Sequence, residues 1–342
     1  MVWTVNHHKH KAAMNKIKQF GIVCCAMLVS AISYAADSKE AEFETYKAAL
    51  KQEAVAQGFG KQFIDNVFAT VFYRPTVVKA DNNQPEKKIT LDTYLTTRVP
   101  DWKVKQAIEL MKTHQPLLTE IGQRYGVQPR FIVALWGNES NFGKIQGKHP
   151  VLSALASLAF EGRREALFKK QLLAALTILQ EGHISLKDFN GSWAGAMGQS
   201  QFMPTSFLSY AVDYDGDGKK DIWGTPADVF ASIANFLSSE GWVNDGTWGR
   251  QVSVTDNFDY ALAGLDKAKF KPLSFWQSQG VRRYDGRDLP DVAINASFIM
   301  PDGEKGRLYL VYQNFHTLMK WNRSSYFGVS VSYLSERIKR GH

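Results

Sequence analysis

The sequence contains only two cysteines, and it has no glycine-rich phosphate loop, no HExxH motif and no GxSxG motif. Both cysteines, Cys24 and Cys25, precede residue 37. If the segment before residue 37 is removed, the remaining chain has no thiol for a disulfide, a zinc site or a cysteine nucleophile. The missing motifs leave phosphoryl transfer, zinc proteolysis and serine hydrolysis without support. The chain also has no internal repeat and no low-complexity linker.

Long hydrophobic runs are scarce. The apolar stretch Phe20–Val29 is shorter than the ~20 residues that a membrane span needs. Lys16 and Lys18 precede it and small residues follow it up to residue 36, which is the pattern of a secretory signal peptide. We therefore expect an exported, periplasmic protein that is soluble or peripherally attached to the cell wall. A buried or membrane-spanning helix and a lipid anchor on one of the two cysteines are the alternatives.

Neither basic nor acidic residues strongly dominate the sequence. The chain has 41 basic and 33 acidic residues, a formal net charge of +8. Four lysines and no acid lie in the predicted signal peptide, so 37 basic and 33 acidic residues, or +4, would remain. This charge suits an anionic partner, but it lacks the clustered basicity of a nucleic-acid-binding protein, and we expect no nucleic-acid partner. With 342 residues, 44% of them hydrophobic, the chain is long enough for one large domain or two to three modest ones.

Apolar residues recur at spacings of three and four through most of the chain, which predicts helices. A polar interruption from Lys79 to Lys88 predicts a loop. After Trp248, short β-branched and aromatic runs predict a small antiparallel sheet before helical spacing returns. We therefore expect a mainly α fold of the α+β class. The predicted segments are a signal peptide over 1–36, a helical domain over 37–125, a helical core over 126–250, a small β domain over 251–316 and a C-terminal segment over 317–342 that returns to the core.

The segment PRFIVALWGNESNFG, beginning at Pro129, places a carboxylate beside an apolar stripe. Glu139 shares a helical face with Leu135 and Trp136, so it should face the interior near the negative end of the helix dipole. Burial and the dipole both raise the pKa of a carboxyl group. An acid that stays protonated near neutral pH suits general acid catalysis of glycosidic cleavage. The alternative is a structural glutamate that bonds backbone amides or pairs with Arg163 or Arg164.

A second segment, GSWAGAMGQSQFMPTSF from Gly191, mixes small residues with hydroxyl and amide side chains. Small residues let a ligand or another backbone approach closely, and amides can bond the acetamido groups of a sugar. The alternative is tight helix packing with glutamines that face solvent. The chain also has nine tryptophans, which suit the apolar faces of sugar rings, although most of them are expected in the core.

The segment DYDGDGKKDIWGTPAD, over 213–228, matches the first half of an EF-hand calcium loop, with acids at alternate positions and a glycine at the sharp turn. Gly224 stands where the standard loop has a bidentate glutamate, so the loop is nonstandard and a later aspartate would close it. One loop of this kind predicts a structural Ca²⁺ that ties two helices together. A solvated acidic turn is the alternative. The predicted ligands are Asp213, Asp215, Asp217, Lys219, Asp221 and Asp228.

Four segments occur in a diagnostic order: ALWGNESNFG, RRE at Arg163–Glu165, GSWAGAMGQSQFMPTSFLSYAVDYDGDGKKDIW and WNRSSYFG. Together they resemble the lytic murein transglycosylase B family of bacterial peptidoglycan enzymes, over roughly Tyr46 to Leu334. The resemblance implies a lysozyme-like helical core that cleaves the β-1,4 bond between N-acetylmuramic acid and N-acetylglucosamine. Attack by the muramic C6 hydroxyl would give a 1,6-anhydro end. Glu139 would act first as the acid and then as the base, without a cofactor.

The resemblance also implies a substrate site and partners. Trp321 stands where relatives often have a tyrosine, which keeps stacking but removes a hydroxyl. Peptidoglycan glycan strands are the expected partner, cell-wall synthesis or division proteins are candidate further partners, and the chain is expected to be a monomer. A muramidase hydrolase and a non-catalytic, calcium-responsive wall-binding module are the alternative functions. The implied substrate-binding residues are Ser192, Gln201, Asn322, Arg163, Arg164, Tyr94, Phe236, Trp321 and Phe327.

Overall fold

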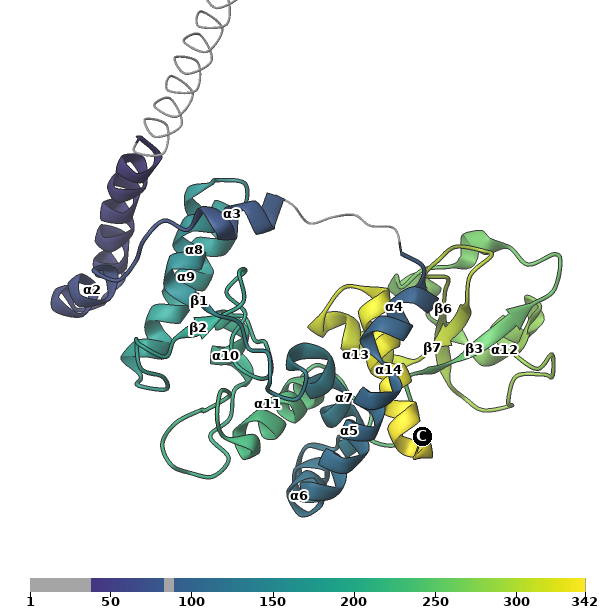
Figure 1. The fold of residues 1–342 in the computed structure, drawn as a ribbon. Helices are drawn as coiled ribbons and strands as arrows, with labels where there is room; N and C mark the ends of the chain where they lie inside the picture. The colour runs from purple at the N-terminus through teal and green to yellow at the C-terminus, as the bar shows by residue number, and fades with distance from the viewer. Residues whose placement is uncertain (1–37, 83–88, 342) are drawn as a thin grey trace, which may run out of the picture.

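A computed structural model describes residues 38–82 and 89–341 (Figure 1). The described chain is mainly helical with a small antiparallel sheet towards its C-terminus, which confirms the predicted fold class. The predicted signal peptide and residues 83–88 of the predicted polar loop lie outside the described residues. None of the described helices is long and apolar enough to cross a membrane.

The helices follow one another along most of the chain, and the sheet interrupts them after residue 248. A helix over 38–56 comes first. The further helices are α2 (Lys61–Phe68), α3 (Pro75–Asn82), α4 (Leu91–Arg98), α5 (Asp101–Thr113), α6 (Gln115–Tyr125), α7 (Pro129–Ser140), α8 (Val151–Phe160), α9 (Glu165–Gln180), α10 (Pro204–Tyr210), α11 (Pro226–Ser239), α12 (Leu273–Ser278), α13 (Gln313–Trp321) and α14 (Ser325–Arg340). The strands are β1 (His149–Pro150), β2 (Asn190–Gly191), β3 (Gly249–Val254), β4 (Lys271–Pro272), β5 (Val281–Arg283), β6 (Asn295–Ile299) and β7 (Leu308–Val311), and short 3₁₀ helices cover Tyr260–Leu262 and Lys267–Lys269.

Helix boundaries follow local sequence signals in most places. Pro129, Pro204 and Pro226 stand in the first turn of α7, α10 and α11, where the missing N–H costs no hydrogen bond. The predicted loop from Lys79 is wrong at its start, because α3 continues to Asn82. Tertiary contacts hold this last turn, since α3 packs against α8 and its Asp81 binds side chains that follow α8.

Two hydrophobic clusters form the core. The first runs from Phe43 to Ile338 and joins the N-terminal helices to α7, α8, α11 and α14. The second lies between the sheet and α12 and includes Val252, Trp276 and Phe298. The larger sheet has the strand order β4-β6-β7-β3-β5 with antiparallel pairing throughout. The first cluster contains residues on both sides of the predicted domain boundary at residue 125. The predicted domain limits stay a prediction.

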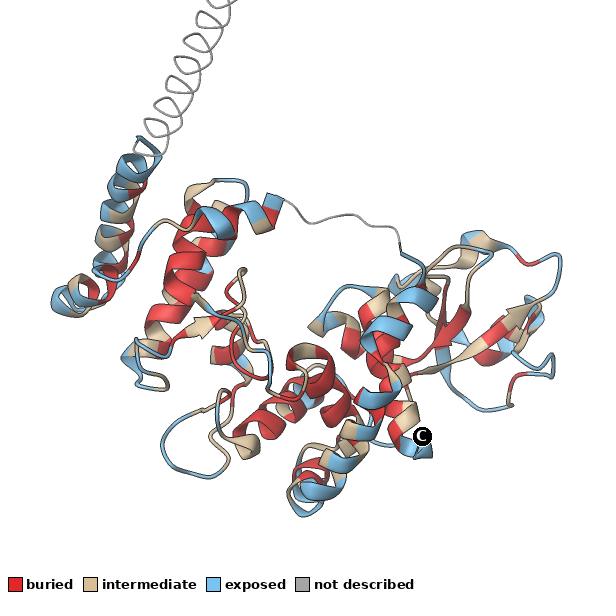
Figure 2. Cartoon of the chain, viewed as in Figure 1, coloured by how far each residue is buried: buried red, intermediate tan, exposed pale blue. Residues whose placement is uncertain are grey.

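Helix α7 lies at the centre of the helical part. It packs against α5, α6, α11 and α14, and all residues over 131–138 are buried (Figure 2). The predicted apolar stripe is therefore buried together with the other faces of α7, because neighbouring helices surround it. A helix that is enclosed in this way holds the residues at its C-terminal end in fixed positions.

Candidate active site

Helix α7 ends in a sharp turn directly after Glu139. Asn141 and Phe142 have φ angles of 51° and 58°, a left-handed conformation that is uncommon for residues other than glycine. The ring of Phe142 lies against Gly137, where an added Cβ atom would be 2.6 Å from the ring. Gln201 is the other non-glycine residue with positive φ in the described part of the chain. Such conformations cluster at functional sites, and all three stand beside or at residues predicted for the site.

The carboxyl group of Glu139 is half-buried at this turn. The indole Nε1–H of Trp321 donates a hydrogen bond of 2.6 Å to its Oε1 atom. The pKa of Glu139 is raised from 4.5 to about 7, because the effect of burial exceeds the lowering by the Trp321 hydrogen bond and the positive charge of Arg98. A large fraction of Glu139 is therefore protonated near neutral pH, and the group can both give and take a proton there.

Two phenylalanines enclose the indole of Trp321. The centroid of its ring lies 4.7 Å from that of Phe236 and 5.2 Å from that of Phe202. Phe236 is 6% exposed and Phe327 is also 6% exposed, so both side chains lie within the core. Phe236 packs against the Trp321 indole from within the core. The sequence argument missed Phe202, although it directly follows the predicted Gln201.

Helix α4 brings an aromatic and a cationic side chain to the same region. The guanidinium of Arg98 lies 5.7 Å from the ring centroid of Tyr94, and the Tyr94 ring packs against Tyr326 at 5.4 Å between centroids. The positive charge of Arg98 lowers the pKa of Glu139, so α4 contributes a cation to the electrostatics of this carboxyl group. Arg98 was also missed, although its spacing of four from Tyr94 puts both on one helical face.

The three polar side chains predicted for the site each bond to a nearby part of the backbone. Ser192 and Gln201 are half-buried, and Asn322, which directly follows Trp321, is exposed. Two isolated bridges fold the segment from Gly191 to Phe202 back on itself, which brings Ser192 towards Gln201. The hydrogen bonds are Ala196 N–H to Ser192 Oγ (3.0 Å), Gln201 Nε2 to Gly198 O (2.8 Å) and to Gln146 O (3.2 Å), and Ser324 N–H to Asn322 Oδ1 (3.1 Å).

The glycine-rich segment forms turns and short bridges, not a helix. A Cβ atom on Gly191 would lie 2.4 Å from a carbonyl oxygen, so this glycine is required by close packing of backbone. Gln199 is 8% exposed, and its amide accepts from Trp136 Nε1 at 2.7 Å and donates to the Trp223 carbonyl at 2.9 Å. Packing is therefore tight at Gly191, but the alternative of helix packing with glutamines that face solvent does not apply to Gln199, which faces the interior.

Arg163 and Arg164 do not pair with Glu139. Both bind the carboxylate of Asp81 at the end of α3, and the Arg163 pair has an N–O distance of 2.6 Å. Asp81 is buried, while both arginines are exposed. The alternative of a Glu139–arginine ion pair is therefore wrong. Arg163 and Arg164 therefore form an exposed pair of cations beside α3, and not part of the surroundings of Glu139.

Three acids of the predicted calcium loop converge. One carboxylate oxygen each from Asp213, Asp215 and Asp217 lies within 4.8 Å of the others. Buried Asp228 accepts two backbone N–H bonds of 2.7 Å, and Asp221 accepts the N–H groups of the turn that follows it. Burial raises the pKa of Asp228, as do the nearby charges of Asp215 and Asp213 to a lesser degree. Three convergent oxygen donors fit the preference of Ca²⁺. In this structure these three carboxylates also accept backbone N–H bonds, as those of Asp221 and Asp228 do.

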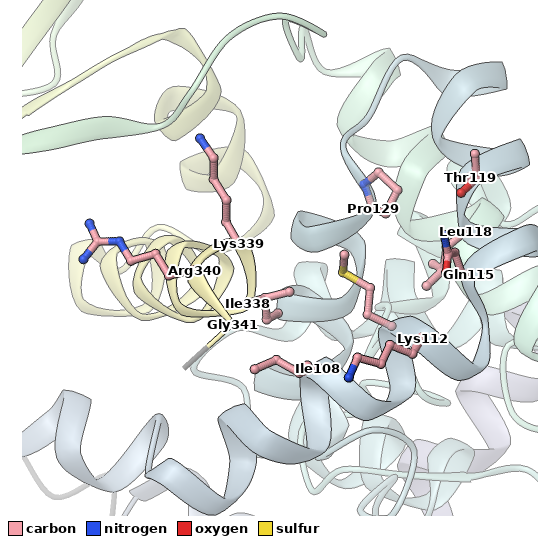
Figure 3. A pocket seen from close by; sticks show the side chains of 11 residues that line it. Ile108, Lys112, Gln115, Leu118, Thr119, Pro129, Ile338, Lys339, Arg340 and Gly341 are labelled. Carbon is pink, nitrogen blue, oxygen red and sulfur yellow. The ribbon is translucent and has the colours of Figure 1, made fainter.

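A separate cavity of about 400 Å³ lies between α5, α6 and the end of α14 (Figure 3). Ile108, Leu118 and Ile338 give it apolar walls, Lys112 also lines it, and the side chains of Lys339 and Arg340 extend away from it (Figure 3). None of the residues that line it was predicted for the site. This cavity is therefore distinct from the region around Glu139.

Known proteins resemble the chain over most of its length. It is 31% identical over 246 residues to the membrane-bound lytic murein transglycosylase B of Escherichia coli (strain K12). The matched region makes up 70% of this chain. The chain spans 64% of the length of that curated relative.

Solved structures of similar proteins share the fold. SltB3 from Pseudomonas aeruginosa in complex with NAG-anhNAM-pentapeptide matches with a TM-score of 0.83 and 43% identity, over 87% of this chain and 79% of that chain. The Escherichia coli lytic transglycosylase Slt35 in complex with calcium matches with a TM-score of 0.76 and 26% identity, over 86% of this chain and 93% of that chain. The family model described as the transglycosylase SLT domain matches residues 42–336, and the chain belongs to this family.

Proposed function

We propose that the chain is an exported lytic transglycosylase that cleaves the β-1,4 bond between N-acetylmuramic acid and N-acetylglucosamine in peptidoglycan. The observation that carries the proposal is Glu139, a half-buried acid at the end of an enclosed helix, whose pKa is raised by burial to about 7. The similar SltB3 protein, which was solved in complex with NAG-anhNAM-pentapeptide, supports the substrate class. The predicted signal peptide supports export to the periplasm.

One carboxyl group serves both halves of the proposed reaction. Glu139 gives its proton to the glycosidic oxygen as the bond from that oxygen to the muramic C1 atom breaks. The resulting carboxylate then takes the proton of the C6 hydroxyl while O6 bonds to C1, which closes the 1,6-anhydro ring. Within the described residues, the other groups that shift the pKa of Glu139 are Trp321 and Arg98. The proposed scheme needs no second acid, unlike that of most glycosidases.

The proposed substrate contacts are divided between two places. Ser192, Gln201 and Asn322 would bond the sugars near Glu139, with Tyr94 as an aromatic contact. Arg163 and Arg164, which are exposed beside Asp81, would meet the carboxylates of the stem peptide. For Phe236 and Phe327, burial in the core supports a role in holding the site in place.

We also propose a structural Ca²⁺ in the loop over 213–228. Asp213, Asp215 and Asp217 would supply the first side-chain ligands, and the Lys219 carbonyl would follow them. The loop joins α10 to α11, so an ion there would connect two helices of the core. The calcium complex of the similar Slt35 protein supports this assignment.

Digestion of purified peptidoglycan sacculi tests the proposed activity. The full chain should release fragments with 1,6-anhydromuramic ends and no new reducing ends, as measured by mass spectrometry. Glu139→Gln should abolish this release, whereas Glu109→Gln, at an exposed position on α5, should leave it unchanged. Reducing muramic ends would instead identify a hydrolase. Binding to sacculi without soluble product from the unmutated protein would identify a wall-binding module.

A further inference from the structure

The contact between Trp321 and Glu139 has a direction that the residue types fix. The indole Nε1–H can only donate a hydrogen bond, and it lies 2.6 Å from Oε1 of Glu139. Oε1 must therefore present a lone pair to the indole whether the carboxyl group is protonated or ionised. A proton on Oε1 in that direction would face the indole N–H and break the bond. When Glu139 is neutral, its carbonyl oxygen is a better acceptor than its hydroxyl oxygen, so the bond from the indole favours the proton on Oε2.

The surroundings of Trp321 hold its indole ring in a fixed position against Glu139. Trp321 is the last residue of α13, and the extended backbone of Asn322 ends the helix there. Its ring packs edge-to-face on Phe236, with an interplanar angle of 65°. The preceding turn is held by Leu318, which is fully buried, and by Lys320, whose Nζ donates to the Glu240 carbonyl at 2.8 Å. Aromatic packing and the helix end thus fix the position of Nε1.

We propose that Trp321 is a positioning residue that keeps the acid proton of Glu139 on Oε2, the oxygen that faces away from the indole. This inference rests on the proposed role of Glu139 as general acid. It assigns Trp321 a function different from the sugar stacking that its residue type predicts. A hydroxyl at the same place could accept a hydrogen bond as well as donate one, and would therefore permit the proton on either oxygen.

The same hydrogen bond favours the ionised acid. A bond donated to a carboxylate is charge-assisted and is stronger than the bond to the neutral acid. Trp321 therefore stabilises the carboxylate that forms when Glu139 gives up its proton. The other charge that acts on Glu139 is that of Arg98, at the end of α4. Because a Trp321 variant leaves Arg98 unchanged, the changes that it causes can be attributed to the lost donor.

Kinetics of Trp321→Phe on a soluble muropeptide chain test the assignment. The variant keeps an aromatic ring and loses the donor, so kcat should fall roughly 10-fold while KM changes less than about twofold. The alkaline limb of the kcat/KM profile should also move to higher pH, because the bond that favours the carboxylate is gone. Trp321→Tyr, which restores a donor, should recover part of both effects. Trp102→Phe, at an exposed position, is the control.

A raised KM with unchanged kcat and an unmoved alkaline limb would overturn the proposal and return Trp321 to sugar stacking. An NMR titration gives an independent answer if the variant does not fold. In the unmutated protein labelled with ¹⁵N-tryptophan, one indole N–H resonance should titrate with a midpoint near that of Glu139, and the same resonance should not titrate in Glu139→Gln. The absence of any such resonance would refute the contact. Inactivity of the unmutated protein together with a titrating indole would instead refute only the proposed reaction.

Discussion

Replacement of Glu139 by glutamine should stabilise the protein at alkaline pH. The pKa of Glu139 is raised from 4.5 to about 7 in the folded protein, mainly by burial, so ionisation of this group opposes folding. Below pH 4.5 the acid is neutral in both the folded and the unfolded state, and it makes no pH-dependent contribution. Between pH 4.5 and about 7 the unfolded chain binds fewer protons than the folded one, so the free energy of unfolding decreases as pH rises.

The magnitude follows from the two pKa values. A difference between 4.5 and about 7 corresponds to about 3 kcal/mol of stability, fully lost above pH 8. Glutamine has no charge to desolvate, and its side-chain oxygen can still accept the Trp321 N–H. The difference in free energy of unfolding between Glu139→Gln and the unmutated protein should therefore grow by about 3 kcal/mol from pH 4 to pH 8.

Urea denaturation at several pH values measures this difference. Subtracting the two proteins at each pH cancels the contributions of all other titrating groups. Glu109→Gln is the matched control, because Glu109 is exposed and the same substitution there should produce no comparable trend. A difference that stays constant from pH 4 to pH 8 would refute the argument that burial holds Glu139 in its protonated form. The gain is expected to coincide with loss of activity, since a strained functional site commonly costs stability.

Two further changes probe the calcium loop and the end of α7. Calcium at about 100 times its Kd should stabilise the protein by about 2.7 kcal/mol and raise its Tm by several degrees. Asp213→Ala should remove this response, whereas Asp245→Ala, outside the loop, should keep it. If calcium leaves the Tm of the unmutated protein and of both variants unchanged, the structural ion is excluded. Gly137→Ala should lower stability by about 1–3 kcal/mol, because the new Cβ would lie 2.6 Å from the Phe142 ring. Gly60→Ala, with open space around it, is the comparison in urea denaturation, and equal midpoints would contradict the packing argument.

Much of the fold could be predicted because apolar spacing reports which residues share a helical face. Prolines marked the starts of α7, α10 and α11 in the same way. Spacing does not report what covers the other faces, and for this reason the complete enclosure of α7 was not foreseen. Helix α8 shows a related limit. Its residues over 151–159 are all buried and, apart from Ser153 and Ser157, all apolar, so its sequence has little periodicity to detect.

The candidate site was harder to predict because its contacts join distant parts of the chain. Glu139 could be singled out from its own helix, since the apolar neighbours and the helix end are local features. Its partner Trp321 lies 182 residues away, and Arg98 comes from a third helix. The sequence showed an indole and a guanidinium, but it could not show that both approach one carboxyl group. Nor could it show that Asp81 binds the two arginines considered as partners of Glu139.

The position of Glu139 between opposing influences explains how one carboxyl group could serve two steps. A carboxyl in water ionises near pH 4.5 and would seldom hold a proton for the leaving oxygen. A carboxyl that is buried without a donor would hold its proton too firmly to give it up or to act afterwards as a base. Burial raises the pKa here, and Trp321 and Arg98 restrain the rise to about 7. Since proton transfer in both directions is most efficient when the pKa lies near the working pH, the two restraining groups are as necessary to the proposed reaction as the burial itself.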